Sequence, residues 1–155
     1  MARGVFQHIL VPHDFSPQAT AALRTAAGLA KAEGGRLTVF HVVVPFYLPA
    51  DTPFGMAAPG DLIPEQRDNL ERLVAKALGS DGPPVTIKIE IGDAAQRIIE
   101  AGSRADSIVM ATSGRSGLAH LLIGSVAEKV VRHATVPVLS VRPAVGRRLA
   151  ARAAR

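Results

Sequence analysis

Residues 38–44 read TVFHVVV, a run in which every residue except His41 is apolar or β-branched. Because polar and apolar positions do not alternate in it, such a run favours a strand that is covered on both faces. Other apolar runs include HILV at residues 8–11 and PVLSV at residues 137–141. We therefore predict five strands, over residues 6–11, 37–43, 85–91, 107–111 and 136–141.

Helical patterns separate these runs. The spacing of alanine and leucine predicts a first helix after Ser16-Pro17, which has the form of an N-cap followed by a first-turn proline. We predict further helices over residues 64–78, ended by Gly79, after Asp93 and from Ser125. Strands that alternate with helices require right-handed crossovers, so the predicted class is α/β. We expect a mostly parallel, doubly wound sheet with helices on both faces. Residues 45–64 hold five of the eleven prolines and are expected to form a loop.

Composition narrows the class of protein. The chain has 155 residues and no cysteine, which favours one domain and excludes disulfides and thiolate metal sites. It has no apolar run of membrane-spanning length and no signal-peptide pattern at its start, so we expect no membrane association and a cytoplasmic location. Residues 144–155 carry four arginines of a net charge of +5, which leaves +1 for residues 1–143. We expect a neutral domain over 1–143 and a disordered basic tail over 144–155, which argues against nucleic-acid binding.

A glycine-rich stretch follows the fourth predicted strand. Gly114, Gly117 and Gly124 would let backbone N–H groups turn toward an anion, and Ser125 opens a helix whose N-terminus favours negative charge. The stretch therefore predicts phosphate binding. The alternative is a simple turn followed by a capping box, in which the side chains of Ser125 and Glu128 bind backbone N–H groups at the start of their own helix. The stretch contains no Walker P-loop and no dinucleotide fingerprint.

Asp14 and the histidines are the other candidates. Asp14 follows the first strand, and a carboxylate there suits hydroxyl or amine groups of a ligand better than its phosphates. The alternative is a turn residue at the start of the first helix. The histidines show no metal-ligand spacing, and we interpret His41 as a core residue of the second strand. No residue stands out as a catalytic base, so no catalytic or metal site is assigned.

Three segments together resemble the universal stress protein family. They are ILVPHDFS at residues 9–16, HVV at residues 41–43, and MATSGRSGLAHLLIGSVAEKVVRHATVPVLSV at residues 110–141. The ATP-binding branch of that family has the pattern G-x-x-G, nine residues, then G-[ST]. Here Gly114 precedes the nine residues RSGLAHLLI and then Gly124-Ser125, whereas Ala111 replaces the first glycine. A methyl group at Ala111 would be strained if its φ were positive.

The resemblance implies a strand order of 3-2-1-4-5 and a site for ATP, with Mg²⁺ carried by the nucleotide. It implies a nucleotide-dependent stress-response protein that is at most a weak ATPase, and a homodimer formed through the last strand, from Val136 to Val141. A nucleotide-free, partner-binding member and a slow nucleotide hydrolase are the alternatives. The implied nucleoside contacts are Pro12, Asp14, Val42 and Met110. The implied phosphate contacts are Gly114, Arg115, Ser116, Gly117, Gly124, Ser125 and Val126.

Overall fold

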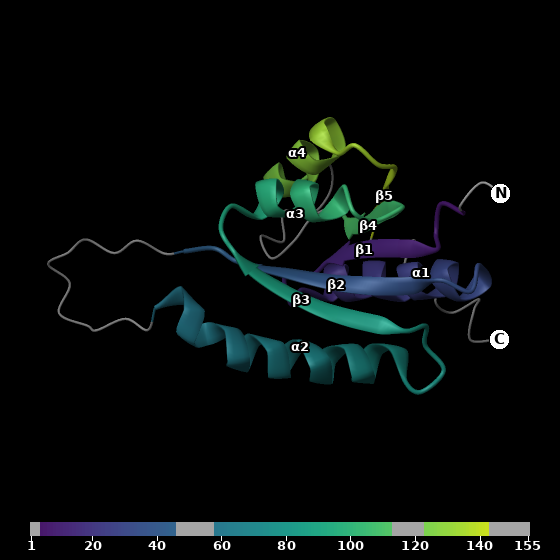
Figure 1. Ribbon diagram of the computed structural model, residues 1–155, viewed down its shortest axis with the longest axis horizontal. Helices are drawn as coiled ribbons and strands as arrows, with labels where there is room; N and C mark the ends of the chain where they lie inside the picture. The colour runs from purple at the N-terminus through teal and green to yellow at the C-terminus, as the bar shows by residue number, and fades with distance from the viewer. Residues whose placement is uncertain (1–3, 46–57, 113–122, 143–155) are drawn as a thin grey trace, which may run out of the picture.

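The protein is described from a computed structural model, which describes residues 4–45, 58–112 and 123–142. Its centre is a parallel sheet of five strands in the order β3-β2-β1-β4-β5 (Figure 1). The strands are β1 (His8–Pro12), β2 (Arg36–Val43), β3 (Val85–Ile91), β4 (Ser107–Ala111) and β5 (Val138–Val141). The predicted doubly wound α/β fold and its strand order are therefore confirmed.

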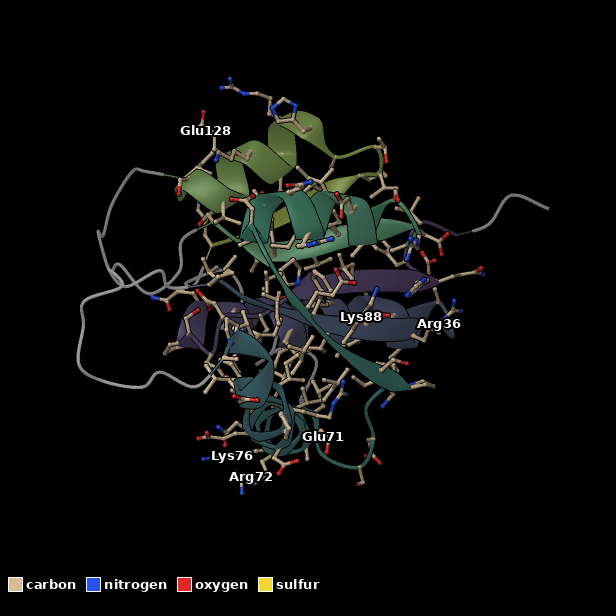
Figure 2. All side chains as sticks on the ribbon, turned by 60° about the vertical axis from the view of Figure 1, so that its left-hand side comes forward. Arg36, Glu71, Arg72, Lys76, Lys88 and Glu128 are labelled. Carbon is tan, nitrogen blue, oxygen red and sulfur yellow. The ribbon has the colours of Figure 1, made fainter. Side chains whose placement is uncertain are left out.

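Four α-helices cover the two faces of the sheet. They are α1 (Pro17–Ala32), α2 (Ile63–Leu78), α3 (Ala94–Gly102) and α4 (Ser125–His133), and a short 3-10 helix spans Pro59–Leu62. Helices α1 and α2 pack on one face, and α3 and α4 pack on the other (Figure 1). The charged side chains of Glu71, Arg72 and Lys76 lie on the outer side of α2 (Figure 2).

The central strands are apolar throughout because both of their faces are buried. In β1, Ile9 and Val11 belong to the core beneath α1 and α2, whereas Leu10 belongs to the core beneath α3 and α4. All three are at most 2% exposed. A continuous apolar run is therefore needed to fill both cores, as expected for a strand buried on its two faces.

The helix ends follow the predicted signals. Ser16 caps α1, and its Oγ accepts the Ala19 N–H at 3.1 Å. Asp93 caps α3 in the same way. At the end of α2, Gly79 has φ 65°, a left-handed conformation that glycine adopts without a steric penalty.

Some boundaries differ from the prediction. Strand β1 begins at His8 rather than residue 6, because the Phe6 N–H is bound by Glu33 Oε2 at 3.1 Å instead of by a neighbouring strand. The last strand begins at Val138 rather than Val136. Pro137 has no N–H to donate, although its carbonyl still accepts the Ile108 N–H at 2.9 Å.

Three predicted features lie wholly or mostly outside the described residues: the basic tail, most of the glycine-rich stretch, and residues 46–57 of the predicted loop. The described end of that loop differs from the prediction, because it forms the 3-10 helix and the start of α2 at Ile63. Among the helices of the described residues, none has the length and apolar character to cross a membrane.

Candidate functional site

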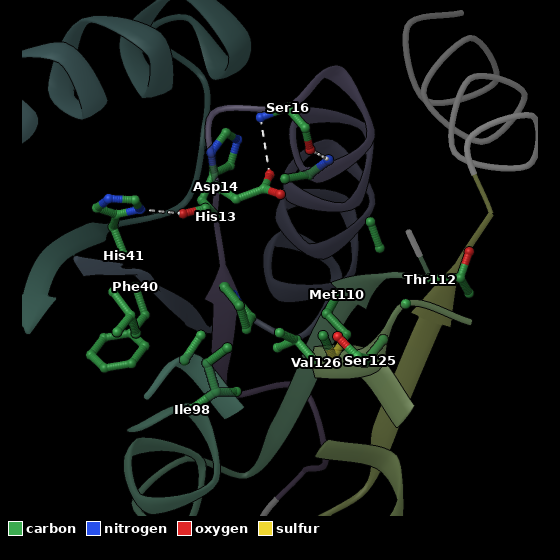
Figure 3. Close-up of a pocket in the computed structure, with 17 residues that line it drawn as sticks. His13, Asp14, Ser16, Phe40, His41, Ile98, Met110, Thr112, Ser125 and Val126 are labelled. Carbon is green, nitrogen blue, oxygen red and sulfur yellow. Dashed lines mark hydrogen bonds between the residues drawn. The ribbon is translucent and has the colours of Figure 1, made fainter. Parts of the chain in front are cut away.

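The described residues form a pocket of about 370 Å³ at the carboxyl ends of the strands. It lies where β1 and β4 meet, which is the point at which the strand order reverses and where ligands bind in open α/β sheets. Residues of the β1–α1 loop, of the end of β2, and of the starts of α3 and α4 line it together (Figure 3).

One wall of the pocket is apolar. Phe40, Ile98 and Met110 belong to the core beneath α3 and α4, and Val42 packs against the same core. These four side chains come from β2, α3 and β4. They can accept a flat apolar group such as a nucleobase, because burying such a surface is favourable and needs no directed partner.

The β1–α1 loop places a carboxylate at the pocket. Asp14 Oδ1 accepts the Ser16 N–H at 3.0 Å, an Asx-turn that fixes the side chain (Figure 3). Asp14 is therefore not the N-cap of α1, which is Ser16. Since a carboxylate oxygen can accept more than one hydrogen bond, Asp14 can also receive hydroxyl hydrogens of a ligand.

His13 precedes Asp14 and is 3% exposed. Its Nδ1 accepts the Phe15 N–H at 3.0 Å, and its Nε2 lies 3.2 Å from Thr20 Oγ1. Burial lowers the pKa of His13 from 6.5 to about 4, with a smaller lowering from His41 and an opposing effect of Asp14. His13 is thus neutral at physiological pH.

The start of α4 forms the opposite side of the pocket. Gly124 is its N-cap residue, its N–H donates to the Thr112 carbonyl at 2.7 Å, and no side chain caps the helix. The capping box considered as an alternative is thus not formed, and the Glu128 carboxylate instead accepts from Arg132 at 2.8 Å. The first-turn N–H groups of Ser125 and Val126 have no acceptor within a helix, so they are available to an anion.

Ala111 ends β4 and also lines the pocket. Phe15 is the non-glycine residue with positive φ in the described part of the chain, so Ala111 has an ordinary strand conformation. The anticipated backbone strain at Ala111 is therefore absent. Its side chain packs partly against the core beneath α1 and α2.

The structure brings together all of the predicted site residues that it describes. Those that line the pocket are Pro12, Asp14, Val42, Met110, Gly124, Ser125 and Val126. The remaining four, Gly114, Arg115, Ser116 and Gly117, lie outside the described residues.

Several pocket residues were not predicted. The interpretation of His41 as a core residue was wrong: it lines the pocket, and its Nδ1–H donates to the His13 carbonyl at 2.7 Å. Its position at the carboxyl end of a strand, beside Val42, was the available signal. Phe40 and Ile98 were predicted as strand and helix residues without a site role, because apolar residues serve cores and pockets alike.

The fold and the pocket define a doubly wound α/β domain with a ligand site at its topological switch point. The model of the universal stress protein family matches residues 6–142. "Universal stress protein in QAH/OAS sulfhydrylase 3'region" from Thermus aquaticus is 36% identical over 143 residues, which are 89% of this chain and 100% of the relative. The chain therefore belongs to the universal stress protein family.

Solved structures agree with this assignment. Universal stress protein UspA from Lactobacillus plantarum has a TM-score of 0.72 and 25% identity, and the match covers 90% of this chain and 100% of that one. The universal stress protein from Archaeoglobus fulgidus in complex with dAMP has a TM-score of 0.61 and 22% identity, covering 88% and 98%. This second likeness is one of fold.

Proposed function

We propose that the pocket binds an adenine nucleotide, ATP with Mg²⁺, and that the protein is a nucleotide-dependent regulatory module of the stress response. The observation that carries the proposal is the uncapped start of α4, which faces the same pocket as the apolar wall and Asp14. A helix N-terminus attracts phosphate, an apolar wall accepts a base, and a carboxylate accepts ribose hydroxyl hydrogens.

Each described residue then has a defined task. The N–H groups of Ser125 and Val126 would donate to phosphate oxygens, and Asp14 would accept from the ribose. The backbone of Val42 would read the edge of the adenine, while Met110 borders the nucleoside. The universal stress protein from A. fulgidus, which has the same fold, was solved in complex with dAMP, and this supports an adenine nucleotide as the class of ligand.

Magnesium would enter with the nucleotide. The described residues contain no group of three or more His, Cys, Asp or Glu side chains that could hold a metal ion. The phosphates would therefore supply the main ligands, as Mg²⁺ commonly prefers, and the ion would neutralise part of their charge.

Two matched variants of Ser125 test the phosphate contact. Ser125→Ala removes only the hydroxyl, whereas Ser125→Pro also removes the N–H. Proline suits the first helical position, and Gly124 already has φ −59° and ψ 151°, an extended conformation that proline tolerates in its predecessor. We expect Ser125→Pro to weaken ATP binding about tenfold relative to Ser125→Ala, the size of a lost charge-assisted hydrogen bond.

Calorimetric titration with ATP and Mg²⁺, and in parallel with adenosine, measures this difference. Adenosine has no phosphate, so its affinity should be equal in the two Ser125 variants. Asp14→Ala should weaken both ligands, because it removes the expected ribose contact. Absence of any binding or thermal stabilisation at millimolar ATP would contradict the proposal and favour a nucleotide-free, partner-binding protein.

We also propose that the protein forms a homodimer through β5. Leu139 of β5 is 39% exposed, and Val131 of α4 is 48% exposed. Exposed apolar side chains beside an open strand edge favour pairing with a second copy.

A further inference from the structure

The loop after β1 contains an unfavourable backbone conformation. Phe15 has φ 65°, in the left-handed region that residues with a side chain rarely adopt. Such a conformation persists only when the surrounding contacts hold it, and it is common at functional sites. Phe15 follows Asp14 directly, so whatever holds Phe15 also fixes Asp14.

His13 supplies the contact that holds it. The Phe15 N–H donates to His13 Nδ1 at 3.0 Å, which requires that this nitrogen carry no proton. Nε2 then carries the ring proton and donates to Thr20 Oγ1, 3.2 Å away. The Thr20 hydroxyl in turn donates to the Ser16 carbonyl at 3.2 Å. The chain of hydrogen bonds is complete for one neutral tautomer of His13.

His41 of β2 holds the same loop from a second side. Its Nδ1–H donates to the His13 carbonyl at 2.7 Å. The Phe15 ring packs edge-on against both imidazoles, with ring centroids 6.1 Å from His13 and 4.8 Å from His41. Strand β2 and helix α1 therefore both contact the loop through His13 and its neighbours.

We propose that His13 is a positioning residue of the pocket: its neutral imidazole holds Phe15 in the left-handed conformation and so sets the position of Asp14. The effect on ligand affinity rests on the proposed nucleotide site. The effect on loop geometry does not, because it depends only on the contacts within the loop.

Protonation of His13 would oppose this arrangement. A proton on Nδ1 would face the Phe15 N–H, so donor would meet donor. Burial and the nearby His41 lower the pKa of His13, while Asp14 of the same loop opposes them and Thr20 of α1 is uncharged. The surroundings of His13 therefore favour its neutral form, which is the form that accepts the Phe15 N–H.

Two replacements separate the acceptor function of His13 from its size. His13→Asn keeps an acceptor for the Phe15 N–H, because an asparagine oxygen can bind the N–H two residues on. His13→Gln is closer to histidine in length but cannot easily form that turn. We expect His13→Gln to weaken ATP binding about tenfold and His13→Asn to change it by less than about threefold.

A third variant tests the backbone conformation. Glycine adopts positive φ without penalty, so Phe15→Gly removes the need for a contact that enforces it. In the Phe15→Gly background, His13→Gln should therefore change ATP affinity by less than about threefold. Equal losses from His13→Gln in both backgrounds, or equal affinities of the Asn and Gln variants, would overturn the positioning role while leaving the nucleotide site intact.

The direct measurement is the ¹⁵N–¹⁵N scalar coupling across the hydrogen bond between Phe15 N and His13 Nδ1, detected by NMR in the wild-type protein without ligand. We expect the coupling in the wild type, together with a neutral Nε2–H tautomer. A protonated ring or an Nδ1–H tautomer at neutral pH would overturn the inference. If the coupling is present and the wild type binds no adenine nucleotide, the proposed function fails and the geometric role of His13 stands.

Discussion

At the scale of single residues, the backbone conformation decides which side chains fit around the pocket. Ala111 replaces a motif glycine, yet it adopts a strand conformation that suits any residue, so the replacement adds no backbone strain. Phe15, for which the sequence predicted no site role, is the residue with the strained backbone. The backbone conformation at a position, rather than its place in a motif, therefore decides whether a side chain there causes conformational strain.

Gly35 is a residue at which the close approach of the backbone excludes a side chain. A Cβ there would lie 2.5 Å from the Phe6 carbonyl oxygen and 2.6 Å from that of Gln7. We expect Gly35→Ala to lower the free energy of unfolding by about 2 kcal/mol, because the backbone cannot move aside cheaply. Urea unfolding measures the change.

Gly28 provides the matched control. It lies within α1, and a Cβ there would meet nothing within 4 Å. Gly28→Ala should raise the free energy of unfolding by about 0.5–1 kcal/mol, since alanine favours the helix. Similar effects of the two substitutions would show that the approach of Gly35 to residues 6–7 is unimportant.

His13 makes stability depend on pH. Its pKa falls from 6.5 to about 4 on folding, so below pH 6.5 the unfolded chain binds a proton that the folded protein does not. Stability therefore falls as the pH decreases from 6.5 toward 4. Between about pH 7 and pH 5 we expect a loss of about 2 kcal/mol from this group.

The measurement is urea unfolding of the wild type and of His13→Asn at both pH values. Asparagine does not titrate, so the difference between the two proteins isolates His13 from the other ionisable groups. The wild type should lose more stability than the variant on acidification. Equal losses would mean that His13 titrates normally in the folded protein.

At the edge strand β3, side chains bind outward-facing carbonyl groups of the backbone. Arg67 of α2 donates to the Ile87 carbonyl at 3.2 Å, and Arg97 of α3 donates to the Ile91 carbonyl at 3.2 Å. Both carbonyls belong to β3, an edge strand of the sheet. The two arginines thus occupy backbone acceptors that another chain could otherwise use, which protects this edge.

Removing both arginines should expose the β3 edge. We expect the double variant Arg67→Ala/Arg97→Ala to stay folded but to associate in a concentration-dependent way, measured by light scattering. Arg72→Ala is the control, because Arg72 is exposed on α2 and its side chain contacts Asn69. A double variant with the same light scattering as the wild type would show that other features protect the edge.

The whole molecule presents its two sheet edges differently. The β3 edge is bound by arginines, whereas β5 carries the exposed Leu139, and Val131 of α4 is exposed as well. This asymmetry favours assembly through β5 and disfavours open-ended stacking through both edges, because only one edge of each copy can pair.

Leu139→Asp tests the assembly. A charge on the paired edge would have to be buried between two copies, so we expect the variant to be monomeric by size-exclusion chromatography with light scattering. Leu62→Asp is the matched control, because Leu62 is similarly exposed, at 36%, but lies in the 3-10 helix away from β5. A wild type that is monomeric at high concentration would contradict the dimer.

By itself, the sequence determined the class of fold, the strand and helix succession, and the loops in which polar residues gather. These follow from local signals: continuous apolar runs require two buried faces, and Ser16, Asp93 and Gly79 mark helix ends. The pairing of residues far apart in the chain did not follow from local signals. The tertiary structure decided that His41 binds the His13 carbonyl and that Phe15 is held at positive φ. It also decided that Gly124, and not Ser125, is the N-cap residue of α4. Each of these depends on which strands are neighbours and on how closely their ends meet, which no single segment specifies.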